Sequence, residues 1–255
     1  MSQDDHANAP DPWEGRDGDT VVNVLVVIAL IGLLVLLLTP QVQQAGAGSA
    51  SREKCMNNLK QIAVALHTYH DAYGSFPPAY VVDEPGTPLY SWRVLVLPYL
   101  DQQFLYEQFH LDESWDSPHN AALLKPVPSV FRCPTRVHKS QNDSPTCTHY
   151  AGVFGSRCVF QGAEPTTLSQ ITDDHAETLL AAEVTDADIP WSAPRDVDVT
   201  QHPKLGDRQG LSSDHPGGLF GMRADGAVRF VLEETDADTV RRLMIRNDGD
   251  EVGEF

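Results

Sequence analysis

The longest uninterrupted hydrophobic stretch of the chain lies near its N-terminus. Residues 21–39, VVNVLVVIALIGLLVLLLT, carry no charge, and only Asn23 interrupts the apolar run. At about 1.5 Å per residue, a helix of this length spans roughly the hydrocarbon core of a bilayer. A soluble helix of five turns would show a polar face. The pattern therefore predicts one transmembrane helix, with the lipid bilayer as its partner.

The segments on either side of this run are polar. Residues 1–20 are acidic and rich in Pro and Gly, which predicts a disordered tail or a degenerate leader. A cleaved secretory signal is the main alternative, because the small residues AGAGSA follow the run. A signal usually has a basic start and an apolar region of about 7–15 residues. We therefore expect residues 21–39 to remain in the mature protein.

A second helical pattern follows Pro40. Apolar residues recur at Leu59, Ile62, Ala63 and Leu66, the spacing of one face of a helix, and continue to Tyr69 or His70. Residues 40–73 are therefore predicted to form a helical extension of the membrane span.

Residues 74–255 have the pattern of a soluble α+β head. Short apolar runs predict strands at 148–155, 158–162 and 178–184, and Trp92, Tyr99 and Trp115 are expected in the core. The segment GLFGMRADGAVRFVLEE predicts a hairpin with a primed turn at Asp225-Gly226. Residues 235–248 predict a short helix capped by Thr235 or Asp236. The expected fold class is α+β, with a long N-terminal helix packed on an antiparallel sheet.

The charge of the chain excludes one class of partner. Eighteen basic against thirty-six acidic residues give a formal net charge of −18. Such a surface repels phosphate backbones, so we expect no nucleic acid partner.

The four cysteines lack the paired spacing of a zinc site, so an exported head would use them in disulfides. Three connectivities are open. We expect Cys147 to pair with Cys158, because two neighbouring strands would bring them together, and Cys55 to pair with Cys133.

Two histidine groups are candidates for chemistry. His67 and His70 lie three residues apart on one helix face, beside Asp71, but no third metal ligand accompanies them. His215 and Asp225 suggest an acid–base dyad. The predicted hairpin separates these two residues by roughly 20 Å, which is too far for a hydrogen bond. We therefore interpret both groups as structural, with Gly226 in the hairpin turn.

The remaining motifs argue against an enzyme. Asp248, Asp250 and Glu251 are weak calcium candidates, since they do not form the twelve-residue loop of a calcium site. Phosphate-binding loops, zinc-protease helices and kinase motifs are missing from the sequence. We expect no cofactor and no catalytic residue.

Several stretches resemble a bacterial family of unknown function with a prepilin-type N-terminal segment and a C-terminal signature of His, nine residues and Asp-Gly. Here the signature is His215 with Asp225-Gly226, in DHPGGLFGMRADG. The resemblance covers residues 24–231, and implies a type IV pilin-like or pseudopilin-like architecture without enzymatic activity. It also rests on CMNNLKQIAVALHTYHDAYGSFPPAY, SWRVLVLPYLDQQ, ESWDSPHN, FRCPT, YAGVFG and ITDDHAETLLAAE, which occur in the family's order.

The N-terminus departs from the pattern that the resemblance implies. Gly18 aligns with the processing boundary, Asp19 with the aromatic first mature residue, and Asn23 with the Glu at position five. In such proteins the Glu pairs with the new terminus of a neighbouring subunit, whereas Asn offers only uncharged hydrogen bonds. Processing after Gly18 and assembly with other pilin-like subunits therefore stay open.

Orientation rests on the resemblance. Arg16 precedes the predicted span, whereas Arg52, Lys54 and Lys60 follow it, and this distribution favours a cytoplasmic head. The resemblance implies a periplasmic or cell-surface head, which we prefer.

The leading functional hypothesis is a membrane-anchored structural or interaction protein. A membrane-tethered solute-binding protein is the alternative, and a hydrolase using His215 and Asp225 comes third. A pocket lined by Trp92, Trp115 and His119 would favour binding, whereas a solid core with a buried His215 would favour the structural hypothesis.

Overall fold

The computed structural model describes residues 17–139, 143–250 and 252. The chain divides into two compact units, Met1–Ser49 and Ala50–Phe255. Most of the predicted tail, residues 1–16, lies outside the described residues. Residues 17–20 of that tail belong to a helix instead.

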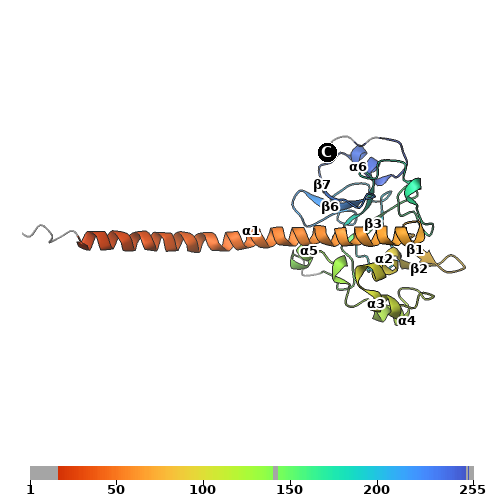
Figure 1. The fold of residues 1–255 in the computed structure, drawn as a ribbon, viewed down its shortest axis with the longest axis horizontal. Coiled ribbons are helices and arrows are strands. Elements are labelled where there is room, and N and C mark those ends of the chain that lie inside the picture. Colours follow the sequence, from red (N-terminus) through yellow and green to blue (C-terminus); the bar gives the residue numbers. More distant parts are fainter. Residues whose placement is uncertain (1–16, 140–142, 251, 253–255) are drawn as a thin grey trace, which may run out of the picture. The chain divides into compact units, whose positions relative to one another are not determined.

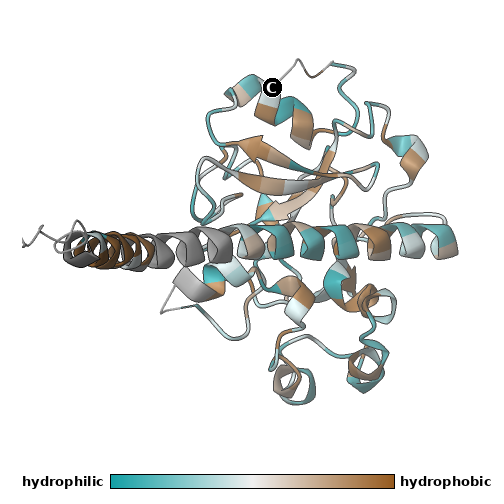
Figure 2. Ribbon diagram, turned by 60° about the vertical axis from the view of Figure 1, so that its left-hand side comes forward, coloured by the Kyte–Doolittle hydropathy of each residue, from teal (hydrophilic) through white to brown (hydrophobic). Residues whose placement is uncertain are grey.

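Helix α1, Asp17–Tyr73, includes the hydrophobic run and continues through Pro40, where the sequence pattern separated two segments. The apolar side chains from Val21 to Val35 are exposed, and Figure 2 shows this stretch as strongly hydrophobic. Within the described part of the chain, no helix combines the length and the apolar character needed to cross a membrane. The side chains of residues 17–19 and 36–48 lie outside the described part, and they include Gly18, Asp19 and the end of the predicted span.

The C-terminal part of α1 is a core element of the second unit. Leu59, Ile62, Ala63 and Leu66 are all at most 2% exposed, as their helical spacing predicts. The predicted head boundary at residue 74 is therefore too late, because the head begins at Ala50 and builds its core on this helix.

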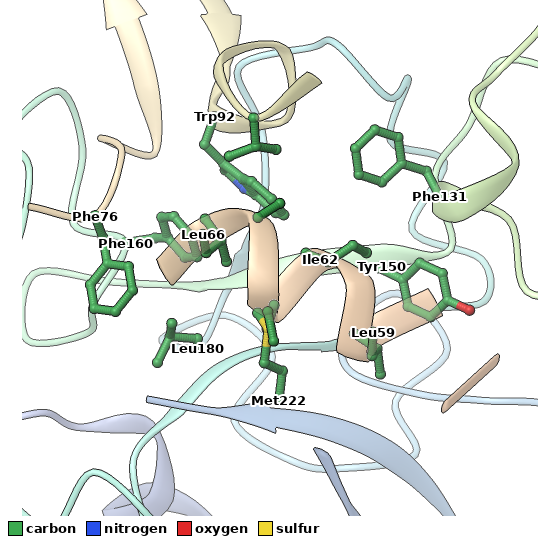
Figure 3. Packing of buried hydrophobic residues seen from close by; sticks show 14 of the residues in the cluster. Leu59, Ile62, Leu66, Phe76, Trp92, Phe131, Tyr150, Phe160, Leu180 and Met222 are labelled. Atoms are coloured by element: carbon green, nitrogen blue, oxygen red, sulfur yellow. The ribbon is translucent and has the colours of Figure 1, made fainter. Parts of the chain in front are cut away.

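Aromatic and aliphatic side chains pack on two sides of this helical segment. Figure 3 shows Trp92 and Phe131 on one side, and Leu180 and Met222 on the other. All four are buried in the same hydrophobic cluster as the helix. The head is thus built in layers around α1 rather than on one side of it.

The first layer is a five-stranded sheet of order β5-β3-β4-β6-β7. The strands β3, β4, β6 and β7 pair antiparallel, as predicted, whereas β5 pairs parallel to β3. The predicted strand at 158–162 is reduced to a single bridge between Phe154 and Phe160. The strand bounds are β3, Tyr150–Phe154; β4, Leu179–Glu183; β5, Val197–Asp198; β6, Gly218–Arg223; and β7, Val228–Leu232.

The central strands of the sheet are buried on both faces. In β6, Phe220 and Met222 belong to the cluster that contains α1, whereas Leu219 belongs to the opposite cluster. Helix α6, Ala237–Met244, adds Val240 and Leu243 to that opposite cluster. Asp236 caps α6 through its carboxylate, as the sequence predicts.

The second layer consists of short helices and one hairpin on the other side of α1 (Figure 1). The predicted core residue Trp92 is fully buried here, but Tyr99 and Trp115 are only partly buried. The elements are β1, Tyr80–Val82; β2, Pro88–Ser91; α2, Trp92–Leu95; α3, Gln103–Gln108; α4, Pro118–Ala122; and α5, Pro134–Lys139. The 3-10 helices are η1, Leu97–Leu100; η2, Ser129–Phe131; and η3, Leu168–Gln170, which lies between β3 and β4 in the chain.

A buried ion pair joins the two layers. The guanidinium of Arg93 at α2 contacts the carboxylate of Asp196, and both side chains are at most 1% exposed. The Arg93 Nε also donates to the Tyr150 carbonyl at 3.2 Å. The Asp196 carboxylate accepts from the Gly152 N–H at 2.6 Å and the Trp92 indole at 3.1 Å. Each charge is therefore held by several polar partners, as a stable buried pair requires.

Replacing Asp196 tests this connection. Asp196→Asn should lower the free energy of unfolding by about 3–5 kcal/mol, because it leaves the Arg93 charge buried without its counter-ion. Asp250→Asn is the control, since Asp250 is 48% exposed in its pairs with Arg241 and Arg242, and exposed pairs contribute about 0–1 kcal/mol. Urea unfolding of the full chain in detergent measures both variants, and equal losses would contradict the assigned role of Asp196.

Candidate functional site

Four buried side chains with metal-ligating or redox-active atoms meet beside α1. They are Cys55, Cys133, Glu183 and His215, and their ligand atoms all lie within 4.8 Å of one another. Among the described residues this is the one such group. Cys55 comes from α1, Cys133 from the residue before α5, Glu183 from the end of β4, and His215 from the loop before β6. The site therefore joins four separate segments of the head.

The two cysteines form a disulfide. Their Cα atoms are 4.9 Å apart and 78 positions apart in the sequence, within the 4.4–6.8 Å range typical of disulfides. Of the two predicted pairs, this is the one that the structure contains. The bond fixes α1 to the short-helix layer near the start of the head.

Cys147 and Cys158 are free, which contradicts the predicted second disulfide. Cys147 lies before β3 and Cys158 after it, so the strand, about 16 Å long at roughly 3.3 Å per residue, keeps them apart. Burial raises the pKa of the Cys158 thiol to about 12. Cys158 is therefore an unreactive packing residue.

His215 pairs with Glu183, not with Asp225. The His215 Nε2 lies 3.1 Å from Glu183 Oε1 and 3.9 Å from the Cys133 Sγ. The other carboxylate oxygen of Glu183 accepts the Phe220 N–H at 2.8 Å. Both side chains of the pair are only 2% exposed. Glu183 was not predicted as a site residue, although an acid at the end of the buried strand LLAAE is an available signal, because buried carboxylates require partners.

Asp225 and Gly226 form the tip of the β6–β7 hairpin. The Asp225 carboxylate accepts the Ala227 N–H at 2.8 Å, and Gly226 has φ of 84°. The predicted primed turn is wrong, because a type I′ turn needs positive φ at both central residues and Asp225 is not among the described residues with positive φ. The Arg223 N–H donates to the Ala227 carbonyl. The loop is therefore a three-residue turn in which only Gly226 is left-handed.

Strand β6 lies between His215 and Gly226 in the chain, and these two residues lie near different positions of α1. His215 contacts the Sγ of Cys133, which is bonded to Cys55 on α1, whereas a Cβ on Gly226 would lie 3.3 Å from the His67 ring. From Cys55 to His67 the helix rises roughly 18 Å, and the six residues of β6 span about 20 Å. The two ends of the strand thus meet α1 at two separate points.

His67 and His70 have a packing role, as the sequence analysis expected. Both rings pack against Phe76, with centroids 5.4 and 5.2 Å away. The His67 Nε2 is buried and has no hydrogen-bond partner. Burial, reinforced by the neighbouring His70, lowers the pKa of His67, although a hydrogen bond with the Ala224 backbone opposes the shift. His67 is therefore held neutral under the hairpin tip.

The calcium candidates are paired with arginines. Asp248 and Asp250 contact Arg241 at 3.2 and 3.4 Å, while Glu251 lies outside the described residues. The Asp173 carboxylate accepts the backbone N–H groups of Asp248 and Gly249. These contacts close the loop after α6 and engage the carboxylates within the protein.

A pocket lined by Trp92, Trp115 and His119, which would favour solute binding, is not among the cavities of the described residues. Trp92 stacks on Phe160 at 5.1 Å inside the core, and the exposed His119 stacks on His110 at 3.5 Å. A cavity of about 480 Å³ lies elsewhere, beside β5.

Several charged groups that line this cavity have partners within the protein. Asp186 pairs with Arg136 and Arg208, and His202 pairs with Asp207. Its lining therefore offers few free charges for a solute.

The fold and the site define an α+β head organised around a buried helix, with a disulfide and a His–Glu pair at one end of the helical segment. Residues 48–204, more than half of the chain, match the model of the family described as "Protein of unknown function (DUF1559)". The chain belongs to this family, which confirms the bacterial family of unknown function expected from the sequence. The matched range does not include the predicted prepilin-type segment, His215 or Gly226. No curated protein and no solved structure matches the chain.

The contact between Gly226 and His67 can be tested with a matched glycine. Gly226→Ala should destabilise the head by more than the roughly 1–2 kcal/mol of a left-handed L-residue, because its Cβ would also press on the His67 ring. Gly86→Ala is the control, since Gly86 has φ of 92° and open space around it. Thermal melts of both full-length variants give the difference, and a smaller loss for Gly226→Ala would contradict the contact.

The neutral state of His67 predicts a pH dependence of stability. The unfolded chain takes up a proton near the ordinary pKa of about 6.5, before the folded chain does. Unfolding free energy should therefore fall as pH drops below about 6.5, until the lowered folded pKa is reached. His67→Asn, which keeps a donor for the Ala224 carbonyl but does not titrate, should reduce this slope.

The measurement is urea unfolding at a series of pH values. Gln61→Asn places the same residue at an exposed position of α1 and removes no titrating group. It should retain the wild-type slope. Equal slopes in wild type and His67→Asn would show that His67 contributes nothing to the acid sensitivity.

Proposed function

We propose that the chain is a membrane-anchored, pilin-like structural or interaction protein, with residues 21–39 in the bilayer and the head outside the cytoplasm. The observation that carries this proposal is the Cys55–Cys133 disulfide. Structural disulfides persist in oxidising compartments and are rare in the cytosol. The charge-free run supports the anchor.

The burial of α1 in the core of the head supports a structural role. Its buried residues, from Cys55 to Leu66, belong to the main hydrophobic core, so the helix cannot leave the head without unfolding it. The disulfide adds a covalent connection only five positions after Ala50, where the head begins. Whatever holds the N-terminal part of α1 therefore also holds the head.

The chemistry of the buried site supports a structural role over a catalytic one. A hydrolase using His215 would need a reachable imidazole and a nucleophile within hydrogen-bond distance. His215 and Glu183 are each 2% exposed, and Phe220 packs edge-on against the His215 ring at 5.4 Å. A substrate would have to open the core to reach this pair.

The charge of the chain also limits the partner. A net charge of −18 favours basic or neutral protein surfaces over nucleic acid or anionic lipid headgroups. Other pilin-like subunits remain the partners that we propose.

Cell fractionation combined with thiol labelling tests the proposal. The full chain should remain in the membrane fraction after alkaline extraction, and protease added to spheroplasts should remove the head. Under denaturing conditions two thiols, Cys147 and Cys158, should react before reduction, and four should react after it. Four reactive thiols in freshly isolated protein, or a head protected in intact spheroplasts, would overturn the assigned compartment.

A matched variant and a mass measurement test the anchor itself. Val26→Arg with Ile31→Arg places two charges in the apolar run, at about 2.5–3.5 kcal/mol each, and should release the chain from the membrane. Two arginines at the exposed head positions Gln61 and Val64 should not. Intact mass should show residues 21–39 in the mature protein. A species that begins at Asp19 would show processing after Gly18, whereas one that begins after Ala45 would contradict the anchor.

A further inference from the structure

The four side chains at the cysteine pair form the donor set of a zinc site. Thiolate sulfur, imidazole nitrogen and carboxylate oxygen are the three ligand types that zinc takes in proteins. With bonds of about 2.0–2.3 Å, a tetrahedral zinc ion holds its ligands roughly 3.3–3.8 Å apart. The ligand atoms of Cys55, Cys133, Glu183 and His215 already lie within 4.8 Å of one another. Only small side-chain movements therefore separate this group from a tetrahedral arrangement.

The backbone around each donor is fixed by the fold. The Cys55 carbonyl accepts the Tyr150 hydroxyl at 3.2 Å, and the Cys133 N–H donates to the His149 Nδ1 at 2.9 Å. The His215 N–H donates to the Ser213 Oγ at 3.0 Å.

The His–Glu pair is oriented in the same way. The Phe220 backbone N–H donates to one oxygen of the Glu183 carboxylate, so that the other oxygen faces the His215 Nε2. Such outer contacts orient the ligands of metal sites. The donors are thus held in place in the absence of a metal.

We propose that the head binds one zinc ion through these four residues when Cys55 and Cys133 are reduced, so that metal and disulfide are mutually exclusive. A protein dithiol supplies the two electrons and two protons that open the S–S bond, and becomes a disulfide itself. Zinc binding then displaces the two thiol protons to solvent and leaves two Zn–S bonds. In the reverse step a protein disulfide takes two electrons from the two thiolates and two protons from solvent, and becomes a dithiol. The re-formed Cys55–Cys133 bond releases the ion, because disulfide sulfurs lack the negative charge that binds zinc.

The ligand count defines the kind of site. Four protein ligands fill a tetrahedral zinc ion and leave no position for water or substrate, which is the arrangement of structural zinc sites. The ion would connect α1, β4 and the loops before α5 and β6, whereas the disulfide connects only α1 and the first of these loops. The site lies wholly within residues 55–215, so the inference does not depend on the membrane anchor.

The test is a titration with Co²⁺, which reports tetrahedral and thiolate coordination by its absorption. The full chain in detergent is reduced under anaerobic conditions, the reductant is removed, and Co²⁺ is added. We expect one equivalent to bind with thiolate-to-cobalt charge-transfer and tetrahedral ligand-field bands, and Zn²⁺ to displace it. The oxidised chain should show neither band. A reduced wild-type chain without these bands overturns the proposal.

Variants assign the ligands. Cys133→Ser should abolish most of the charge-transfer band, and His215→Gln and Glu183→Gln should weaken binding at least as much as the ~10–100-fold loss known for outer contacts. The matched control is Cys147→Ser with Cys158→Ser, which leaves only the site thiols and should bind as wild type. Unchanged binding in His215→Gln and Glu183→Gln, or binding lost in the control, contradicts the assignment.

Circular dichroism decides the case in which the reduced chain unfolds. Metal sites of this kind couple binding to folding, so one equivalent of Zn²⁺ should then restore the helical signal of the reduced wild type. The reduced His215→Gln variant should require far more Zn²⁺ for the same recovery. A reduced chain that stays unfolded at one equivalent of Zn²⁺ overturns the proposal.

Discussion

The head depends on the burial of α1 between two layers that share one hydrophobic cluster with it. Leu59, Ile62 and Leu66 are fully buried, with the five-stranded sheet on one side and the short helices on the other. At about 1.5–3 kcal/mol for each large apolar side chain removed from water, this face of the helix contributes more than any single polar contact. The polar connections, namely the disulfide, the Arg93–Asp196 pair and the His215–Glu183 pair, then fix the register of the layers.

Local patterns were enough to predict much of this fold. The helical spacing at Leu59, Ile62 and Leu66, the buried run 178–184, the hairpin at Asp225-Gly226 and the cap at Asp236 all depend on neighbours within a few positions. Their physical signals are periodicity, turn chemistry and capping, which the sequence displays directly.

What the sequence did not predict depends on contacts between distant segments. Glu183 meets His215 across 32 positions, and Arg93 meets Asp196 across 103. The pairing of four cysteines has three solutions on the sequence alone, and the choice depends on where β3 places Cys147 and Cys158. The head boundary failed for a related reason, since the same amphipathic pattern suits an isolated extension and a helix buried between two layers.

The position of β6 in the sheet affects the order in which the chain can complete its fold. During synthesis Cys55 and Cys133 become available well before Gly218–Arg223, yet this late strand lies inside the sheet, between β4 and the edge strand β7. Until β6 is synthesised, one edge of β4 therefore has no strand to pair with. An exposed strand edge can pair with other chains. Phe220 and Met222 also complete the hydrophobic cluster around α1. We therefore expect a chain truncated before residue 218 to aggregate rather than to fold into a smaller head.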